Sequence, residues 1–114
     1  MKFTIKTIKV DLTPSLRIYV EEKMEPLDKF IKRFEDSGDA EILLSLERVT
    51  QHHKHGDVFG AKATVVLPHK ILRAEEEAGD VRSAIDMLKD TLRLELEKYK
   101  ERFLTSRRPR DSSQ

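Results

Sequence analysis

Apolar and polar residues alternate along two adjacent segments in the middle of the chain, residues 40–49 and 58–67. Successive side chains of a strand point to opposite faces, so each segment is predicted to be a strand with one buried face. Segment 2–10 shows the same alternation, and Pro68-His69 predicts a tight turn into a short strand at 70–76. The sequence therefore predicts a sheet of four strands.

Two segments repeat apolar residues every three or four positions, as amphipathic helices do. The first begins after Thr13, the predicted N-cap, with Pro14 in the first turn, and is predicted to end at Gly38. Pro26 is expected to kink this helix or restart it after Met24. Its predicted core residues are Leu16, Val20, Met24, Leu27, Ile31 and Phe34.

The second helix is predicted over residues 81–103, with Asp80 as its N-cap after Gly79. Its predicted core residues are Val81, Ile85, Leu88, Leu92, Tyr99 and Phe103. The element order is then β-α-β-β-β-α. Laying both apolar helix stripes on one face of a single sheet gives an α+β fold. We expect one folded domain over residues 1–103 and a basic, disordered tail over 104–114.

Charge is abundant but balanced, since Lys and Arg number 22 against 21 Asp and Glu, for a net charge of +1. Any case for nucleic-acid binding must therefore depend on where the charges lie. The absence of cysteine excludes disulfides and thiolate metal sites. No phosphate loop, nucleophile elbow or zinc-protease motif occurs, so we expect no catalysis, cofactor or small-molecule substrate. No signal peptide or membrane-spanning run is visible, which favours a cytoplasmic protein.

Residues 50–57 read TQHHKHGD and place three histidines next to a Gly-Asp pair. A metal site is one interpretation, because imidazole binds zinc and nickel, but His52 and His53 would point apart in an extended chain. A second interpretation is a solvated hairpin turn without a binding role, closed by Gly56-Asp57. The third is a loop that touches an RNA backbone through Lys54 and imidazoles such as His55. We favour the polar hairpin loop and expect no metal.

Basic residues recur at nearly one angle along the second helix, as an edge of its buried face: Arg82, Lys89, Arg93 and Lys100. The opposite edge carries Lys98 and Arg102 beside Met87 and Leu94, and the acidic residues Asp86, Asp90, Glu97 and Glu101 are predicted on the outward face. The first helix contributes Arg17, Lys23 and Lys29, with Lys23 at the core edge. One interpretation of such a stripe is a surface that binds polyanions. The other is a solvated helix face without a binding function, stabilised by ion pairs such as Asp86 with Lys89.

The segments LTPSLRIYVEEKMEPLDKF and KATVVLPHKILRAEEEAGDVRSAIDMLKDTLRLELEKYKERF resemble the ribosome hibernation-promoting factor family, also called ribosome-associated translation inhibitors. The combination of LPHKILRAEE, AID and a helix closing on KYK carries the resemblance. Family members share the β-α-β-β-β-α fold, whose arrangement resembles a double-stranded-RNA-binding domain. The resemblance implies rRNA contacts by Arg17 and Lys23, by Lys98 and Lys100 of the KYK pair, and by Lys89 and Arg93.

The family resemblance implies a function in binding rather than catalysis. Such proteins bind the small ribosomal subunit near the decoding region through its rRNA, block translation sterically, and keep ribosomes inactive under stress. The chain resembles the short form, which lacks the C-terminal domain that pairs two ribosomes, and we expect a monomer when it is free. The alternatives are a generic RNA- or ribosome-binding module in subunit assembly, and a protein-interaction domain that uses Met87 and Leu94.

Overall fold

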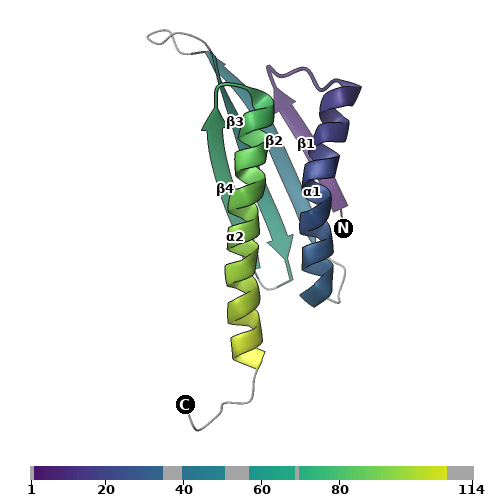
Figure 1. The fold of residues 1–114 in the computed structure, drawn as a ribbon, viewed down its shortest axis with the longest axis vertical. Coiled ribbons are helices and arrows are strands. Elements are labelled where there is room, and N and C mark those ends of the chain that lie inside the picture. The colour runs from purple at the N-terminus through teal and green to yellow at the C-terminus, as the bar shows by residue number, and fades with distance from the viewer. Residues whose placement is uncertain (1, 35–39, 51–56, 69, 108–114) are drawn as a thin grey trace.

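The computed structural model describes residues 2–34, 40–50, 57–68 and 70–107, which form four strands and two helices (Figure 1). The strands are β1 (Lys2–Ile8), β2 (Glu41–Thr50), β3 (Asp57–Leu67) and β4 (Lys70–Ala78). The helices are α1 (Pro14–Phe34) and α2 (Val81–Arg107). The predicted order β-α-β-β-β-α is confirmed.

The strands form one sheet in the order β1-β2-β3-β4. β1 and β2 run parallel, with Phe3 opposite Ile42, and α1 makes the crossover that a parallel pair requires. β2, β3 and β4 are antiparallel neighbours, so that Val65 of β3 lies between Ile42 and Leu72. This register aligns the apolar residues of all four strands on the same face.

Both helices cover that face and leave the other face open (Figure 1). α2 contacts β3, β4 and α1, while α1 lies over the β1 side of the sheet (Figure 1). Ala61 and Ala63 of β3 are fully or almost fully buried, and their small side chains leave room for the helices to approach the sheet. The predicted arrangement of two helices on one side of a sheet is therefore confirmed.

Both predicted N-caps are confirmed. The Leu16 backbone N–H donates to Thr13 Oγ1 at 3.1 Å, and the Ser83 backbone N–H donates to Asp80 Oδ1 at 2.8 Å. The Ser83 hydroxyl donates to the second oxygen of Asp80, also at 2.8 Å. Hydrogen bonds from Ser83 stabilise the charged carboxylate, which lowers the pKa of Asp80.

Two predictions about the helices need correction, and the predicted end of α1 at Gly38 lies outside the described residues. α1 runs without a break through Pro26, so the predicted restart after Met24 is wrong. Pro26 and Glu22 are both exposed, so water can reach the Glu22 carbonyl that Pro26 leaves without an amide donor. α2 continues to Arg107, past the predicted end at Phe103, because neither Gly nor Pro occurs before Pro109. The proposed division into a domain and a tail stays a prediction, and residues 108–114 lie outside the described residues.

The predicted core is largely confirmed, and it also contains residues that the pattern missed. Phe30, Ala84 and Leu96 are buried although they were not predicted to be. Phe30 is buried because the apolar stripe of α1 widens on the side that faces α2. The side chains of Phe34 and Phe103, both predicted in the core, lie outside the described residues. Neither described helix has a stretch long and apolar enough to cross a bilayer.

Candidate nucleic-acid interface

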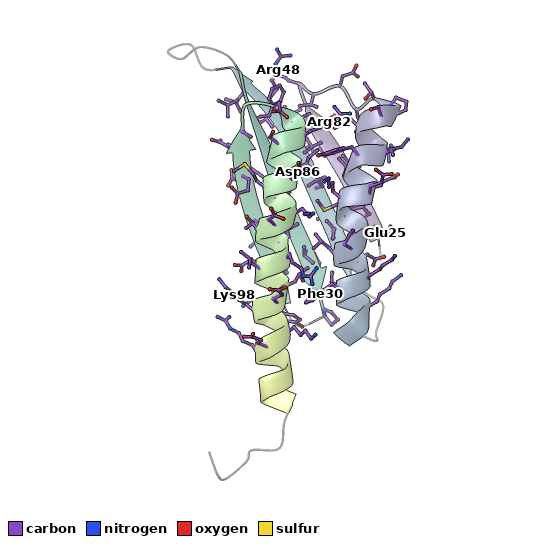
Figure 2. All side chains as sticks on the ribbon, in the orientation of Figure 1. Glu25, Phe30, Arg48, Arg82, Asp86 and Lys98 are labelled. Atoms are coloured by element: carbon purple, nitrogen blue, oxygen red, sulfur yellow. The ribbon has the colours of Figure 1, made fainter. Side chains whose placement is uncertain are left out.

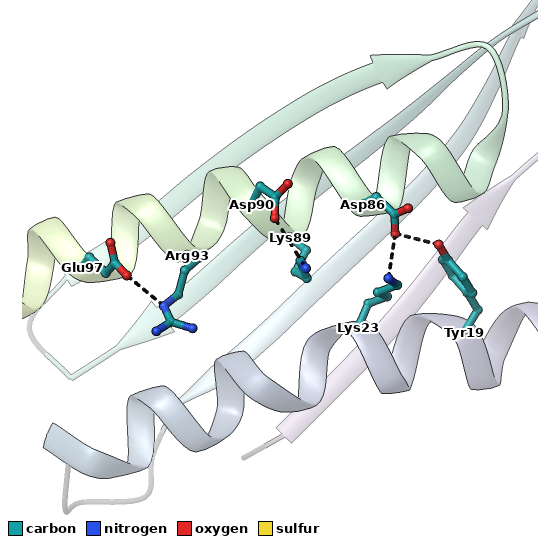
Figure 3. A network of polar contacts seen from close by, with 7 residues as sticks. All are labelled: Tyr19, Lys23, Asp86, Lys89, Asp90, Arg93 and Glu97. Atoms are coloured by element: carbon teal, nitrogen blue, oxygen red, sulfur yellow. Dashed lines mark hydrogen bonds and ion pairs between the residues drawn. The ribbon is translucent and has the colours of Figure 1, made fainter.

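Most of the predicted cations lie along the line where the two helices face each other (Figures 2 and 3). We call this surface the helix seam. Its residues are Tyr19, Lys23 and Phe30 from α1 and Arg82, Asp86, Lys89, Arg93 and Lys100 from α2. The basic stripe predicted on α2 therefore faces α1, and Lys23 adds a cation from the opposite helix.

Tyr19 organises the end of the seam near the N-terminus of α2 (Figure 3). Its hydroxyl donates to Asp86 Oδ1 at 2.6 Å, and the Lys23 ammonium lies 3.4 Å from the same oxygen. Lys23 and the Arg82 guanidinium also lie 5.3 Å and 5.1 Å from the centre of the Tyr19 ring. Arg82 donates a further hydrogen bond to Ser15 Oγ at 2.9 Å. The two cations are thus held in place by a ring and by fixed acceptors.

The contact between Tyr19 and Asp86 shifts the pKa of both groups. The hydrogen bond from the Tyr19 hydroxyl stabilises the Asp86 carboxylate, which lowers the pKa of Asp86, with a smaller contribution from Lys23. The same bond raises the pKa of Tyr19, because losing the phenol proton would break it and place two negative charges together. Asp86 is therefore a stable carboxylate and Tyr19 a stable hydrogen-bond donor at neutral pH.

Phe30 organises the other half of the seam. The Arg93 guanidinium lies 4.4 Å from the centre of the Phe30 ring, and the Lys100 ammonium lies 5.4 Å from it. Arg93 also donates from Nε to Glu97 Oε2 at 3.1 Å, one turn along α2. Lys89 lies between Asp86 and Arg93 along α2 and is 3.5 Å from Asp90 (Figure 3). Tyr19 and Phe30 therefore each lie beside two cations.

The other predicted site residues that the structure describes lie away from the seam. Arg17 is exposed on α1 and lies 3.9 Å from Glu21, and Lys29 is exposed on the same helix. Lys98 lies on the opposite edge of α2, 3.5 Å from Glu95 (Figure 2). Lys54 and the histidine loop lie outside the described residues, so the alternatives for that loop stay open. The described part of the chain has no cluster of three or more His, Cys, Asp or Glu side chains able to hold a metal.

Asp86 corrects the predicted distribution of acidic residues. It was expected on the outward face as a partner of Lys89, but it points into the seam and pairs with Lys23 of the other helix. Tyr19 and Phe30 were not predicted as site residues either. A signal existed for Asp86, because position 86 falls within about 40° of Arg82 around an ideal helix. The contributions of Tyr19 and Phe30 follow from how the two helices pack.

The seam is suited to binding anions. Its cations project from two helices along one line, and aromatic rings restrict their side chains before a ligand arrives. The seam carboxylates neutralise part of this charge, and such exposed pairs are weak enough for a competing anion to replace them. A polymer with regularly spaced negative charges would contact several of these cations at once.

Comparison with known proteins places this fold, a sheet covered on one face by two helices, in a defined class. Residues 3–103 match the model of the family described as Sigma 54 modulation protein / S30EA ribosomal protein. The chain belongs to this family. The resemblance inferred from the sequence is therefore confirmed.

Three relatives show how the similarity is distributed. The ribosome hibernation promotion factor of Lactococcus lactis subsp. cremoris is 34% identical over 98% of this chain and 55% of the relative. That of Deinococcus radiodurans is 33% identical over 86% of this chain and 48% of the relative. The ribosome hibernation promoting factor of Azotobacter vinelandii is 30% identical over 98% of this chain and 97% of the relative. The chain thus spans about half the length of the first two and nearly all of the third.

Two solved structures have the same fold. The N-terminal domain of Thermus thermophilus Protein Y superposes with a TM-score of 0.68 at 27% identity, covering 87% of this chain and 99% of that domain. A ribosomal subunit interface protein from Coxiella burnetii also gives 0.68, at 24% identity, covering 89% of this chain and 99% of that protein. The second likeness concerns the fold alone.

Proposed function

We propose that this protein is a ribosome hibernation factor that binds the small ribosomal subunit near the decoding region and sterically blocks translation. The observation that carries this proposal is the helix seam, where Lys23, Arg82, Lys89, Arg93 and Lys100 form one line of cations across two helices. Family membership and the names of the relatives support a ribosomal partner. Such a partner would place the protein in the cytoplasm, where ribosomes work.

In the proposed complex, the seam cations contact phosphates of the small-subunit rRNA. Each contact releases counterions from the RNA, so affinity should fall steeply as salt rises. Phosphate oxygens would take the place of carboxylates such as Glu97 and Asp90, whose pairs with Arg93 and Lys89 are partly exposed. Tyr19 and Phe30 would keep the cations aligned during this exchange. Recognition would depend on the shape and backbone of the RNA rather than on base identity.

Inhibition needs no chemical step in this mechanism. The two helices are packed on the sheet through a continuous apolar core, so the domain fills space as a rigid body. A rigid domain bound at the decoding region would exclude mRNA and tRNA. Release would follow when the phosphate contacts weaken, and the internal carboxylates would help by re-forming their pairs with the seam cations.

A charge-neutralising variant tests the proposal directly. Replacing Lys89, Arg93 and Lys100 with Gln should lower affinity for small subunits more than tenfold, and should reduce the slope of log affinity against log salt by about three. The matched control replaces Lys6, Lys62 and Arg73, which are exposed on the open sheet face and carry the same total charge. Co-sedimentation over a salt series measures both variants. Equal binding by the two variants would show that the seam is not the rRNA contact.

Footprinting separates hibernation from a general role in RNA binding or subunit assembly. Protection of rRNA nucleotides by the wild-type protein should cluster at the decoding region and disappear with the seam variant. Seam-dependent protection elsewhere on the small subunit would favour the assembly alternative. The absence of binding to small subunits even at low salt would exclude both.

A further inference from the structure

A second cationic site lies on the opposite edge of α2, where the helix borders β4. A pocket of about 110 Å³ occurs there, and we call it the α2–β4 pocket. It is lined by Lys70, Leu72, Glu95, Lys98, Tyr99 and Arg102. Leu72 and Tyr99 are only 5% and 7% exposed, so they belong to the core, whereas the charged residues are at the surface. The pocket therefore combines buried walls with a charged rim.

The charges at this rim are less neutralised than those of the seam. Lys98 lies 3.5 Å from Glu95, which offsets one cation. Within the described part of the chain, neither Lys70 nor Arg102 is held by a carboxylate, unlike Lys23, Lys89 and Arg93 in the seam. Two elements thus converge on the pocket with a surplus of positive charge, three cations against one carboxylate.

The dimensions of the pocket fit a single tetrahedral oxyanion. The volume of about 110 Å³ is several times the roughly 10–15 Å³ that a single water needs, so one phosphate group with its oxygens can enter. We infer that the α2–β4 pocket binds a backbone phosphate of RNA, with Lys70 and Arg102 as its principal contacts. This inference rests on the proposed function and adds a second point of contact to it.

The two sites place cations on both flanks of α2. Arg93 and Lys100 face α1, whereas Lys98 and Arg102 border β4, and a helix with its side chains is about 10–12 Å wide. In Figure 1 the C-terminal part of α2 extends past the end of the sheet, which makes this helix the accessible ridge of the domain. α2 would then lie between two stretches of phosphate backbone, the seam contacting one and the pocket the other. Such a contact fixes the orientation of the helix on the RNA.

A double variant tests the pocket without touching the seam. Lys70→Gln with Arg102→Gln should lower affinity for purified small subunits about tenfold at low salt. The slope of log affinity against log salt should fall by about two. The matched control is Lys62→Gln with Arg73→Gln on the open sheet face, which removes the same charge and should leave both quantities unchanged. Thermal unfolding of all variants verifies that each is folded.

The outcomes distinguish the pocket from the proposed function. If the seam variant binds small subunits more weakly but the pocket variant binds them as well as its control does, phosphate binding in the α2–β4 pocket is overturned and the proposed function is not. Equal losses for the pocket variant and the control would show an effect of net charge and would overturn it too. Failure of the wild-type protein to bind small subunits would overturn both proposals. If α2 contacts two separate stretches of phosphate backbone, a variant that combines the seam and pocket substitutions should lower the slope of log affinity against log salt by the sum of the two separate decreases.

Discussion

The two faces of the sheet carry similar side chains but use them differently. On the covered face, Ile42, Leu44 and Leu46 of β2 pack beneath the helices, whereas Leu43 between them is exposed on the open face. Charged pairs differ in the same way. In the seam, Lys23 and Asp86 pair with each other and both contact Tyr19. On the open face, Lys62 and Glu75 are 3.7 Å apart, and each side chain is more than half exposed. Packing around a residue, rather than its type, decides whether it occupies a fixed position.

This difference explains how a chain with a net charge of only +1 can present a cationic surface. Charges on the open face are solvated and screened, so they contribute little to binding or to stability. Charges in the seam are placed by aromatic rings and hydrogen bonds, so their arrangement survives in the free protein. The positions of the charges therefore matter more for binding than the net charge of the chain. Matched substitutions in the two regions can test this comparison.

The largest expected difference concerns two leucines. Leu92→Ala removes a side chain that is 0% exposed beneath α2 and should lower the free energy of unfolding by about 2–5 kcal/mol. Leu43→Ala removes the same atoms from the open face, where Leu43 is 40% exposed, and should change it by about 0.5 kcal/mol or less. Urea unfolding followed by circular dichroism measures both. A similar cost at the two positions would mean that the open face is also covered in solution.

A smaller difference is expected between the two kinds of ion pair. Tyr19→Phe removes the hydrogen bond to Asp86 and should cost about 1 kcal/mol, because the acceptor is charged but partly exposed. Lys62→Gln breaks the pair with Glu75 on the open face and should cost less than about 0.5 kcal/mol. Chemical unfolding at neutral pH measures each variant against the wild type. Equal costs would remove the distinction between seam and open face.

The cost of Tyr19→Phe should also depend on pH. The pKa of Asp86 is lowered in the folded protein, so its contribution is present above the unfolded value of about 3.9 and is lost as pH falls through the folded value. The pKa of Tyr19 is raised, so its contribution is present below about 10 and is lost as pH rises through the folded value. The cost should therefore be constant between about pH 5 and 9 and should shrink in acid and in alkali. A flat profile below pH 4 would contradict the assigned hydrogen bond.

Most of the fold followed from periodicity in the sequence, because each strand and helix buries only one face. The caps at Thr13 and Asp80 were predictable because a side-chain oxygen at that position accepts a backbone N–H of the first turn. The restart expected at Pro26 was wrong because one missing hydrogen bond on an exposed side is tolerated in a helix that packs on a sheet. Local sequence rules describe isolated helices, and tertiary packing outweighed the rule here.

The candidate site was predicted only in part. Helical spacing identified the basic stripe of Arg82, Lys89, Arg93 and Lys100, since these positions share one angle on a single helix. It did not identify Tyr19 and Phe30 as the rings beneath them, because the pairing of residues across two helices depends on how the helices pack. It likewise gave no indication of the α2–β4 pocket, since Lys70 and Arg102 are brought together by the sheet. The sequence therefore predicted which residues share a face of one helix, but it did not predict which residues meet across two elements.

The smallest effect is expected for the exposed apolar residues of α2. Met87 and Leu94 are 43% and 58% exposed, and this observation favours the alternative of a protein-interaction surface. On the open sheet face Ile71 is similarly exposed, at 48%, so exposure by itself does not select α2. We expect Leu94→Glu and Ile71→Glu to elute as the wild-type monomer in size-exclusion chromatography at high concentration, with binding to small subunits unchanged. If Leu94→Glu alone dissociates a larger species, then α2 carries a self-association surface, and its outward residues contact protein rather than solvent.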